Sequence, residues 1–229
     1  MTGILLVDKP MEWTSMDVCA HLRGVLQEKH VGHTGTLDPN ATGLLVVLAG
    51  RPATRLAPLL EADGKEYLAA FRPGLVTDTQ DVWGTVLRRE EPALDRAALE
   101  AVLSRFRGNI EQIPPMYSAI KLRGQKLYQI ARRGGTVERE PRPITIETLD
   151  IVGQDGTDWL LRIRCSKGTY VRTLCADIGE ALGCGGCMSA LRRTAAGRFS
   201  VEEAHTLEEI RLAPEKYLLP TQLITGENV

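Results

Sequence analysis

The segment with the clearest capacity for chemistry is Gly32-His33-Thr34-Gly35-Thr36-Leu37-Asp38-Pro39-Asn40-Ala41-Thr42-Gly43. Its glycines allow the backbone to approach a ligand closely. Pro39 disfavours helical geometry at Asp38, so the carboxylate is presented from an extended or turn conformation. Asp-Pro is also common in ordinary turns, and the residues alone favour that simpler interpretation. We therefore predict a Gly-rich loop from Val31 to Gly43, with Asp38 as its candidate catalytic group.

Other sequence motifs for group transfer are missing. The chain contains no P-loop, no dinucleotide fingerprint and no HExxH pattern, so phosphate transfer, hydride transfer and zinc hydrolysis lack their usual residues. Cys184-Gly185-Gly186-Cys187 is a lone CxxC, without a second pair or a nearby histidine, and is more typical of a turn than of a zinc or redox site. We expect neither an organic cofactor nor a metal.

The charges are unevenly distributed, although the formal net charge is only -1. Residues 119–145 and residues 161–198 each contain seven Lys or Arg against two acidic residues, whereas residues 201–229 contain six acidic residues against two basic ones. Four of the five tyrosines lie in or beside the segments that we single out, where rings could stack on bases. Two interpretations stay open for the basic stretches: solvated faces or a nucleic-acid surface.

Periodicity predicts the elements that position these residues. Apolar runs predict strands at residues 4–7, 44–49 and 67–71, and an alternating pattern predicts a half-buried strand at residues 159–165. A capping box at Thr14 and Asp17 predicts a helix, and further helices are expected at residues 94–106 and from about Thr169 to Gly183. Because strands and helices intermix without a regular alternation, we predict a mixed α+β fold rather than a doubly wound parallel sheet.

Length and composition suit a globular domain. A chain of 229 residues with 43% hydrophobic and 25% charged residues can bury a core without disulfides or a structural metal. No apolar run is long enough to cross a bilayer, and no charged leader with a cleavage site is recognised. Five scattered cysteines indicate reduced thiols. These features predict a cytoplasmic protein with no membrane association.

The Asp38 segment closely resembles the catalytic motif of the bacterial TruB family of tRNA pseudouridine synthases. Further blocks resemble this family in its own order: Lys65-Glu66-Tyr67, Thr77-Asp78-Thr79-Gln80-Asp81, Ile113-Pro114-Pro115-Met116-Tyr117-Ser118-Ala119, Cys165-Ser166-Lys167-Gly168-Thr169-Tyr170-Val171-Arg172-Thr173 and Leu191-Arg192-Arg193. The resemblance extends from about residue 3 to residue 210. It implies the pseudouridine synthase fold, with a largely antiparallel central sheet, flanking helices and a basic RNA-gripping insertion.

The resemblance also implies a reaction. Uridine 55 in the T loop of tRNA is flipped out, its glycosidic bond breaks, the base turns, and carbon 5 is joined to the sugar. Asp38 is then the essential carboxylate, Arg172 its ionic partner, and Tyr67 the ring that stacks on the flipped base. Asp81 would share that arginine. Whether Asp38 attacks the sugar, attacks the base or removes a sugar proton stays open.

Three further residues, His33, Tyr170 and Leu191, match family positions that line the substrate pocket. Without the resemblance, Tyr67 could be a core residue, Arg172 an exposed surface arginine and Leu191 plain packing. The insertion is expected at about residues 117–145, where the residues predicted to bind RNA are Lys121, Arg123, Lys126, Arg132 and Arg133.

The expected organisation is a catalytic domain over residues 1–210 followed by an acidic segment at residues 211–229, without the full C-terminal PUA domain common in the family. The expected partner is the T arm of tRNA, with no obligate protein partner. Alternatives are a guide-RNA-dependent subunit of the dyskerin type, a tRNA-folding chaperone, and a carbohydrate-acting enzyme that uses Asp38, Asp78 and Asp81.

Overall fold

The computed structural model describes residues 1–61, 64–122 and 124–225, and the chain forms two compact units. The first unit combines residues 1–68 with residues 191–229, and the second contains residues 69–190. Two strands, β4 (Lys65–Pro73) and β12 (Gly186–Ala196), contribute residues to both units. The fold is mixed α+β with a mostly antiparallel central sheet, as the sequence predicts.

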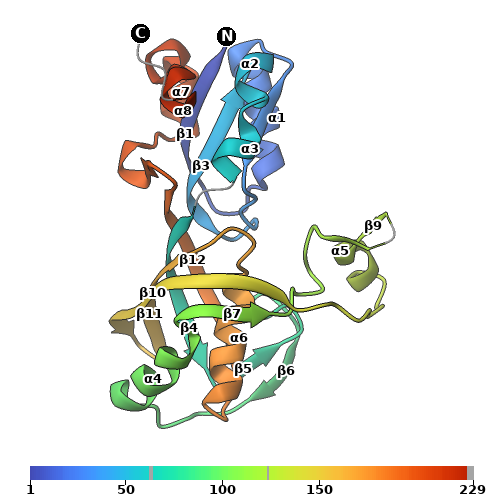
Figure 1. Ribbon diagram of the computed structural model, residues 1–229, viewed down its shortest axis with the longest axis vertical. Coiled ribbons are helices and arrows are strands. Elements are labelled where there is room, and N and C mark those ends of the chain that lie inside the picture. Colours follow the sequence, from blue (N-terminus) through green and yellow to red (C-terminus); the bar gives the residue numbers. More distant parts are fainter. Residues whose placement is uncertain (62–63, 123, 226–229) are drawn as a thin grey trace. The chain divides into compact units, whose positions relative to one another are not determined.

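The first unit is built on strands β1 (Gly3–Lys9), β2 (Val31–Thr34) and β3 (Thr42–Ala49), as Figure 1 shows. β1 and β2 both pair antiparallel with β3, and β12 pairs parallel with β3 where Arg193 lies opposite Gly43. The other elements of the unit are α1 (Ser15–Leu26), α2 (Arg51–Thr54), α3 (Ala57–Glu61), β13 (Phe199–Ser200), η2 (Val201–Glu203), α7 (Leu207–Leu212), η3 (Pro214–Tyr217) and α8 (Gln222–Thr225).

Side-chain alternation along β1 divides the core of the first unit between the two faces of the sheet. Leu5 and Val7 belong to one buried cluster, which also contains side chains of α1 and α7. Ile4 and Leu6 point the other way, into a second cluster with side chains of α2 and α3. Successive strand residues point to opposite faces, so a strand covered on both sides reads as a continuous apolar run.

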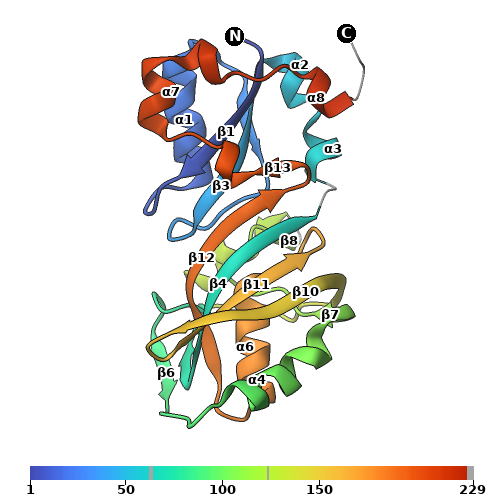
Figure 2. The same ribbon diagram turned by 90° about the vertical axis from the view of Figure 1, so that its left-hand side faces the viewer.

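The second unit has the strand order β12, β4, β11, β10, β7. Strand β10 pairs antiparallel with both β11 and β7, and helices α4 and α6 lie beside these strands in Figure 2. Its elements are β5 (Leu75–Thr77), β6 (Val86–Arg89), α4 (Arg96–Leu103), η1 (Ser104–Phe106), β7 (Gly108–Gln112), β8 (Lys121–Leu122), β9 (Gln125–Lys126), α5 (Leu127–Ala131), β10 (Arg142–Asp155), β11 (Asp158–Cys165) and α6 (Val171–Ala181).

Most predicted elements are confirmed with small shifts at their ends. The capping box at Thr14 and Asp17 is present in both directions and starts α1. The helix predicted from Leu94 begins two residues late because the Asp95 side chain caps it by accepting from the Ala98 N–H. The predicted loop from Val31 to Gly43 is too long at both ends. Val31–Thr34 is strand β2, and β3 already begins at Thr42, so the loop is confined to residues 35–41.

Candidate functional site

Asp38 lies in the loop between β2 and β3, and the residues on either side of it are fixed by hydrogen bonds. The Leu37 N–H donates to Ser15 Oγ at 2.9 Å, and Ser15 Oγ is 3.1 Å from the Leu37 carbonyl oxygen. On the other side, Lys9 Nζ donates to the Pro39 carbonyl oxygen at 3.0 Å. Asp38 itself is half-buried. The carboxylate is therefore carried by a backbone segment held at both neighbours, the kind of preorganisation that a catalytic group needs.

Lys9 is the most unusual residue near this loop, because its side chain is fully buried. Its ammonium donates to three carbonyl oxygens, those of Pro10 at 2.7 Å, Trp13 at 2.6 Å and Pro39 at 3.0 Å, which uses all three of its N–H donors. Burial lowers the pKa of Lys9 to about 8, and the nearby Asp38 carboxylate opposes this shift. Lys9 is therefore still mostly charged at neutral pH and places positive charge close to Asp38.

Arg193 on β12 is a second buried cation of the first unit, and it connects the first residue of the loop to strand β3. Its Nε donates to the Leu44 carbonyl oxygen at 2.7 Å and its Nη2 donates to the Gly35 carbonyl oxygen at 3.1 Å. Burial and the Arg193 charge both lower the pKa of His33, so His33 on β2 is neutral at physiological pH. Arg193 thus defines the loop geometry and the charge state of a predicted pocket residue.

Gly43, at the start of β3, shows how closely this strand packs against β12. Its φ is +97°, and a Cβ atom would overlap the backbone oxygen and nitrogen of Arg193. We expect Gly43→Ala to lower the free energy of unfolding by about 3 kcal/mol, because strain and backbone overlap both oppose the side chain. Urea denaturation measures this. Gly32→Ala is the control, since a Cβ at Gly32 meets nothing within 4 Å; equal losses in both variants would contradict the explanation.

The other predicted residues of the first unit are Tyr67 and Leu191. Tyr67 lies in β4 with only 7% of its surface exposed, and Leu191 is half-buried in β12. Both positions are compatible with the packing alternatives that the sequence left open. Their roles toward a substrate stay predictions.

In the second unit, Arg172 is the second residue of helix α6 and its side chain is buried, so the alternative of an exposed surface arginine is wrong. Its Nη1 donates to the Thr79 carbonyl oxygen at 3.1 Å and its Nη2 donates to the Tyr117 carbonyl oxygen at 2.9 Å. The Asp81 carboxylate lies 3.8 Å from Nη1. Arg172 therefore joins three blocks that are distant in sequence. Its pairing with Asp38 stays a prediction.

Tyr170 directly precedes α6, and its main chain is held by the side chain of Gln112 on β7. The Gln112 amide donates to the Tyr170 carbonyl oxygen at 3.1 Å, and its oxygen accepts from the Tyr170 N–H at 2.8 Å. Helix α6 has no side-chain cap of its own, and these two bonds hold the backbone of its N-cap residue. Tyr170 is thus fixed at the helix end that carries Arg172.

The basic insertion projects from the second unit as a small lobe containing β8, β9 and α5 (Figure 1). In it, two cations lie over the Tyr128 ring, with Lys126 Nζ at 5.6 Å and Arg132 Cζ at 5.3 Å from the ring centroid. Arg132, Arg133 and Lys121 are exposed, whereas the predicted residue Arg123 lies outside the described residues. An aromatic ring with cations beside it suits RNA binding, because the ring can stack on a base while the cations contact phosphates.

Sequence reasoning missed Lys9, Ser15 and Arg193 as residues that shape the loop. Neither Lys9 nor Ser15 was singled out, and Arg193 was named only as part of a family block. The one sequence signal available for Lys9 was its position between a predicted buried strand and a proline.

Among the described residues, no group of three or more His, Cys, Asp or Glu side chains could hold a metal ion. None of the described helices combines the length and the apolar character that a membrane-spanning helix needs.

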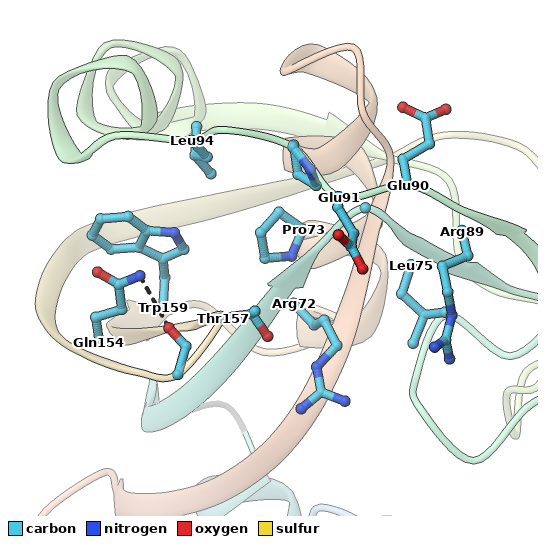
Figure 3. Close-up of a pocket in the computed structure, with 13 residues that line it drawn as sticks. Arg72, Pro73, Leu75, Arg89, Glu90, Glu91, Leu94, Gln154, Thr157 and Trp159 are labelled. Atoms are coloured by element: carbon cyan, nitrogen blue, oxygen red, sulfur yellow. Dashed lines mark hydrogen bonds between the residues drawn. The ribbon is translucent and has the colours of Figure 1, made fainter.

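A cavity of about 580 Å³ lies in the second unit, and Figure 3 shows its lining. Its wall includes Trp159, Arg72 and Arg89 together with Glu90 and Glu91. None of the site residues predicted from the sequence lines it, and its wall mixes both signs of charge. The lining of this cavity therefore does not indicate a particular class of ligand.

Comparisons with known proteins agree on one family. The family model for the TruB family pseudouridylate synthase N-terminal domain matches residues 23–171, and that for the tRNA pseudouridylate synthase B C-terminal domain matches residues 172–220. Proteins named tRNA pseudouridine synthase B are similar to this chain. The one from Azoarcus sp. BH72 is 49% identical and covers 93% of this chain and 70% of the relative. The one from Opitutus terrae is 46% identical, and the alignment covers 96% of this chain and 93% of that relative.

Solved structures agree with this relationship. A chain of a Cbf5–Nop10–Gar1 complex superimposes with a TM-score of 0.78 at 29% identity, covering 97% of this chain and 61% of that chain. A chain of an archaeal box H/ACA Nop10–Cbf5 complex gives a TM-score of 0.71 at 28% identity. This chain spans about three fifths of the length of these solved chains, 61% and 60%. On the family models and the sequence relatives together, the chain belongs to the TruB family of pseudouridylate synthases.

Proposed function

We propose that the protein is a tRNA pseudouridine synthase that converts uridine 55 in the T loop of tRNA to pseudouridine. The observation that carries the proposal is the preorganised Asp38 loop, fixed at Leu37 by Ser15 and at Pro39 by Lys9, in a chain of the TruB family. The match to proteins named tRNA pseudouridine synthase B supports tRNA as the substrate class.

The reaction is an isomerisation that needs no external oxidant or reductant. The bond between the sugar and base nitrogen 1 breaks, a bond between the sugar and carbon 5 forms, and the hydrogen on carbon 5 leaves to solvent while nitrogen 1 gains a proton. We assign the essential carboxylate to Asp38 and the stacking ring to Tyr67. Flipping the uridine costs a few kcal/mol, and stacking on an aromatic ring returns about 1–3 kcal/mol.

We assign Arg172 as the ionic partner of Asp38. Its burial and its two hydrogen bonds to carbonyl oxygens support a fixed position, and its charge favours an ionised carboxylate. Asp81 shares this arginine, and His33, Tyr170 and Leu191 line the pocket. The reduced thiols expected from the cysteine pattern support a cytoplasmic location.

Tritium release tests the proposal. A T-arm transcript labelled at carbon 5 of its uridines is incubated with the protein alone, with no added cofactor, guide RNA or partner protein. We expect stoichiometric release from one uridine, and none from a transcript with cytidine at the target position. Absence of release from both the T arm and intact tRNA would overturn the proposal.

A guide-RNA-dependent subunit is the second candidate, favoured by the likeness to chains of Cbf5 complexes. Release only after addition of a guide RNA and partner proteins would establish it instead. The relatives named tRNA pseudouridine synthase B, at up to 49% identity, support the stand-alone enzyme more strongly.

The exposed arginines of the insertion give a separate prediction about RNA binding. Replacing Arg132 and Arg133 together with glutamine should weaken T-arm binding equally for different loop sequences. It should also reduce the slope of log K against log salt by about one to two, because fewer counterions are released. Fluorescence anisotropy at several salt concentrations measures both effects. Replacing Arg51 and Arg55, two exposed arginines of the first unit, removes the same charge and should leave the slope unchanged.

A further inference from the structure

Trp83 is an exposed tryptophan in the turn between β5 and β6, with 45% of its surface accessible. Tryptophan side chains are highly buried on average, and an exposed indole on an ordered turn is available to contact a ligand or a partner. The protein has two other tryptophans, Trp13 and Trp159, and Trp159 is only 5% exposed. Trp13 is partly buried against the core of the first unit, so Trp83 is the most exposed of the three tryptophans.

The turn that carries Trp83 is held together around the Asp81 carboxylate. Asp81 Oδ1 accepts from Thr79 Oγ1 at 2.6 Å and from the Trp83 N–H at 3.1 Å. The Asp81 carbonyl oxygen accepts from Thr77 Oγ1 at 2.6 Å. Gly84, the next residue, has no room for a side chain, because a Cβ would overlap the side chains of Thr79 and Asp78. The backbone on both sides of the indole is thus fixed.

The same turn is attached to β12 and α6. The Val82 N–H donates to the Met188 carbonyl oxygen at 3.0 Å, and the Met188 N–H donates to the Gln80 carbonyl oxygen at 3.0 Å. Gln80 has a left-handed φ of 65°, and its side-chain oxygen accepts from Thr173 Oγ1 at 2.8 Å. A non-glycine residue held in this conformation by surrounding bonds is a mark of functional turns. Ordering Trp83 therefore costs little when a ligand binds.

The chemistry of the turn selects the kind of contact. Residues 77–85 contain two carboxylates, Asp78 and Asp81, and no lysine or arginine, so the turn is poorly suited to phosphates. A rigid indole in such a setting offers a π-face to a base rather than a charge to the backbone. The Asp81 carboxylate also lies 3.8 Å from Arg172 Nη1. Trp83 follows Asp81 by two residues, so the Cα atoms of the two lie within about 7 Å of each other. The turn that carries the indole thus also carries a residue assigned to the substrate site.

We propose that Trp83 is a stacking platform for an unpaired RNA base that flanks the target uridine. This inference rests on the proposed function and adds to it a specificity-determining contact outside the assigned pocket. The contact favours substrates whose loop leaves a base unpaired at that position, and it is independent of phosphate binding.

The test compares Trp83→Ala with Trp83→Phe in T-arm binding. The alanine variant should raise Kd by about 5- to 150-fold, the range typical for loss of one stacked base. The phenylalanine variant keeps a π-face and should stay within about threefold of wild type. The slope of log K against log salt should not change in either variant. Leu87→Ala is the matched control, since Leu87 on β6 is 66% exposed and apolar but has no π-system.

Abasic substitution along the loop identifies the contacted base. At one flanking position, removing the base should weaken wild type but not Trp83→Ala, while at other positions both proteins should lose affinity alike. A Kd for Trp83→Ala within twofold of wild type, or an equal loss in Leu87→Ala, overturns the proposal. So does a change in oligomeric state without a change in Kd, which would assign the indole to a protein contact.

The result for Trp83 can be distinguished from the result for the proposed function. Wild-type protein that binds the T arm through Trp83 but releases no tritium would contradict the enzyme assignment and leave the stacking contact standing. Normal tritium release together with an unchanged Kd for Trp83→Ala would support the enzyme assignment and contradict the stacking contact. Thermal melting of each variant confirms that the fold is intact, because an exposed side chain at a surface turn contributes little to stability.

Discussion

Asp38→Asn should lower turnover by at least about ten-thousandfold, equivalent to roughly 5.5 kcal/mol of activation free energy. The amide keeps the shape of the side chain but lacks the charge needed to attack or to accept a proton. The fold should persist, because the bonds from Ser15 to Leu37 and from Lys9 to Pro39 involve the backbone of neighbouring residues. Single-turnover tritium release measures the effect.

Two control measurements accompany Asp38→Asn. The Kd for the same T-arm transcript should change by less than about threefold, and the urea midpoint of unfolding should stay close to that of wild type. Asn40→Asp, which adds a carboxylate two residues away, should not restore activity in the Asp38→Asn background. Turnover within tenfold of wild type for Asp38→Asn would remove Asp38 from the assigned role.

Arg172→Lys should lower turnover by about 10- to 150-fold while changing T-arm affinity little. Lysine keeps the charge but cannot reproduce the planar fork, and a lost hydrogen bond of a charged group corresponds to about 1.5–3 kcal/mol. In the structure, the fork reaches the Thr79 and Tyr117 carbonyl oxygens at the same time. Single-turnover rates and anisotropy titrations at several salt concentrations separate the two effects.

Arg164→Lys provides the matched control, because Arg164 on β11 forms an exposed ion pair with Glu147 at 2.7 Å. Exposed pairs contribute little, so this variant should behave like wild type. If Arg172→Lys instead alters the salt slope as much as replacement of Arg132 and Arg133, then Arg172 contacts a phosphate. Its assignment as the partner of Asp38 would then be wrong.

Local patterns in the sequence predicted seven of the elements, namely β1, β3, β4, β11, α1, α4 and α6, whereas the long strands β10 and β12 were not predicted. The capping box at Thr14, the alternation from Trp159 to Cys165 and the apolar run before Ala49 each depend on residues that are neighbours in sequence, and each element is present. Other errors occurred at the boundaries of elements. Strand β2 was interpreted as loop because Gly32 and His33 carry no strand signal of their own, and their strand conformation comes from pairing with β3.

The sequence by itself predicted the fold class and the family, and it made Asp38 the candidate carboxylate because Asp38, its glycines and Pro39 are adjacent in one short segment. Only the tertiary structure revealed how that segment is held. Lys9, Ser15 and Arg193 reach it from β1, α1 and β12, up to 158 residues away. Likewise, the burial of Arg172 depends on carbonyl groups of Thr79 and Tyr117. Sequence patterns record local periodicity, whereas a buried cation is stabilised by whichever distant acceptors the fold brings to it.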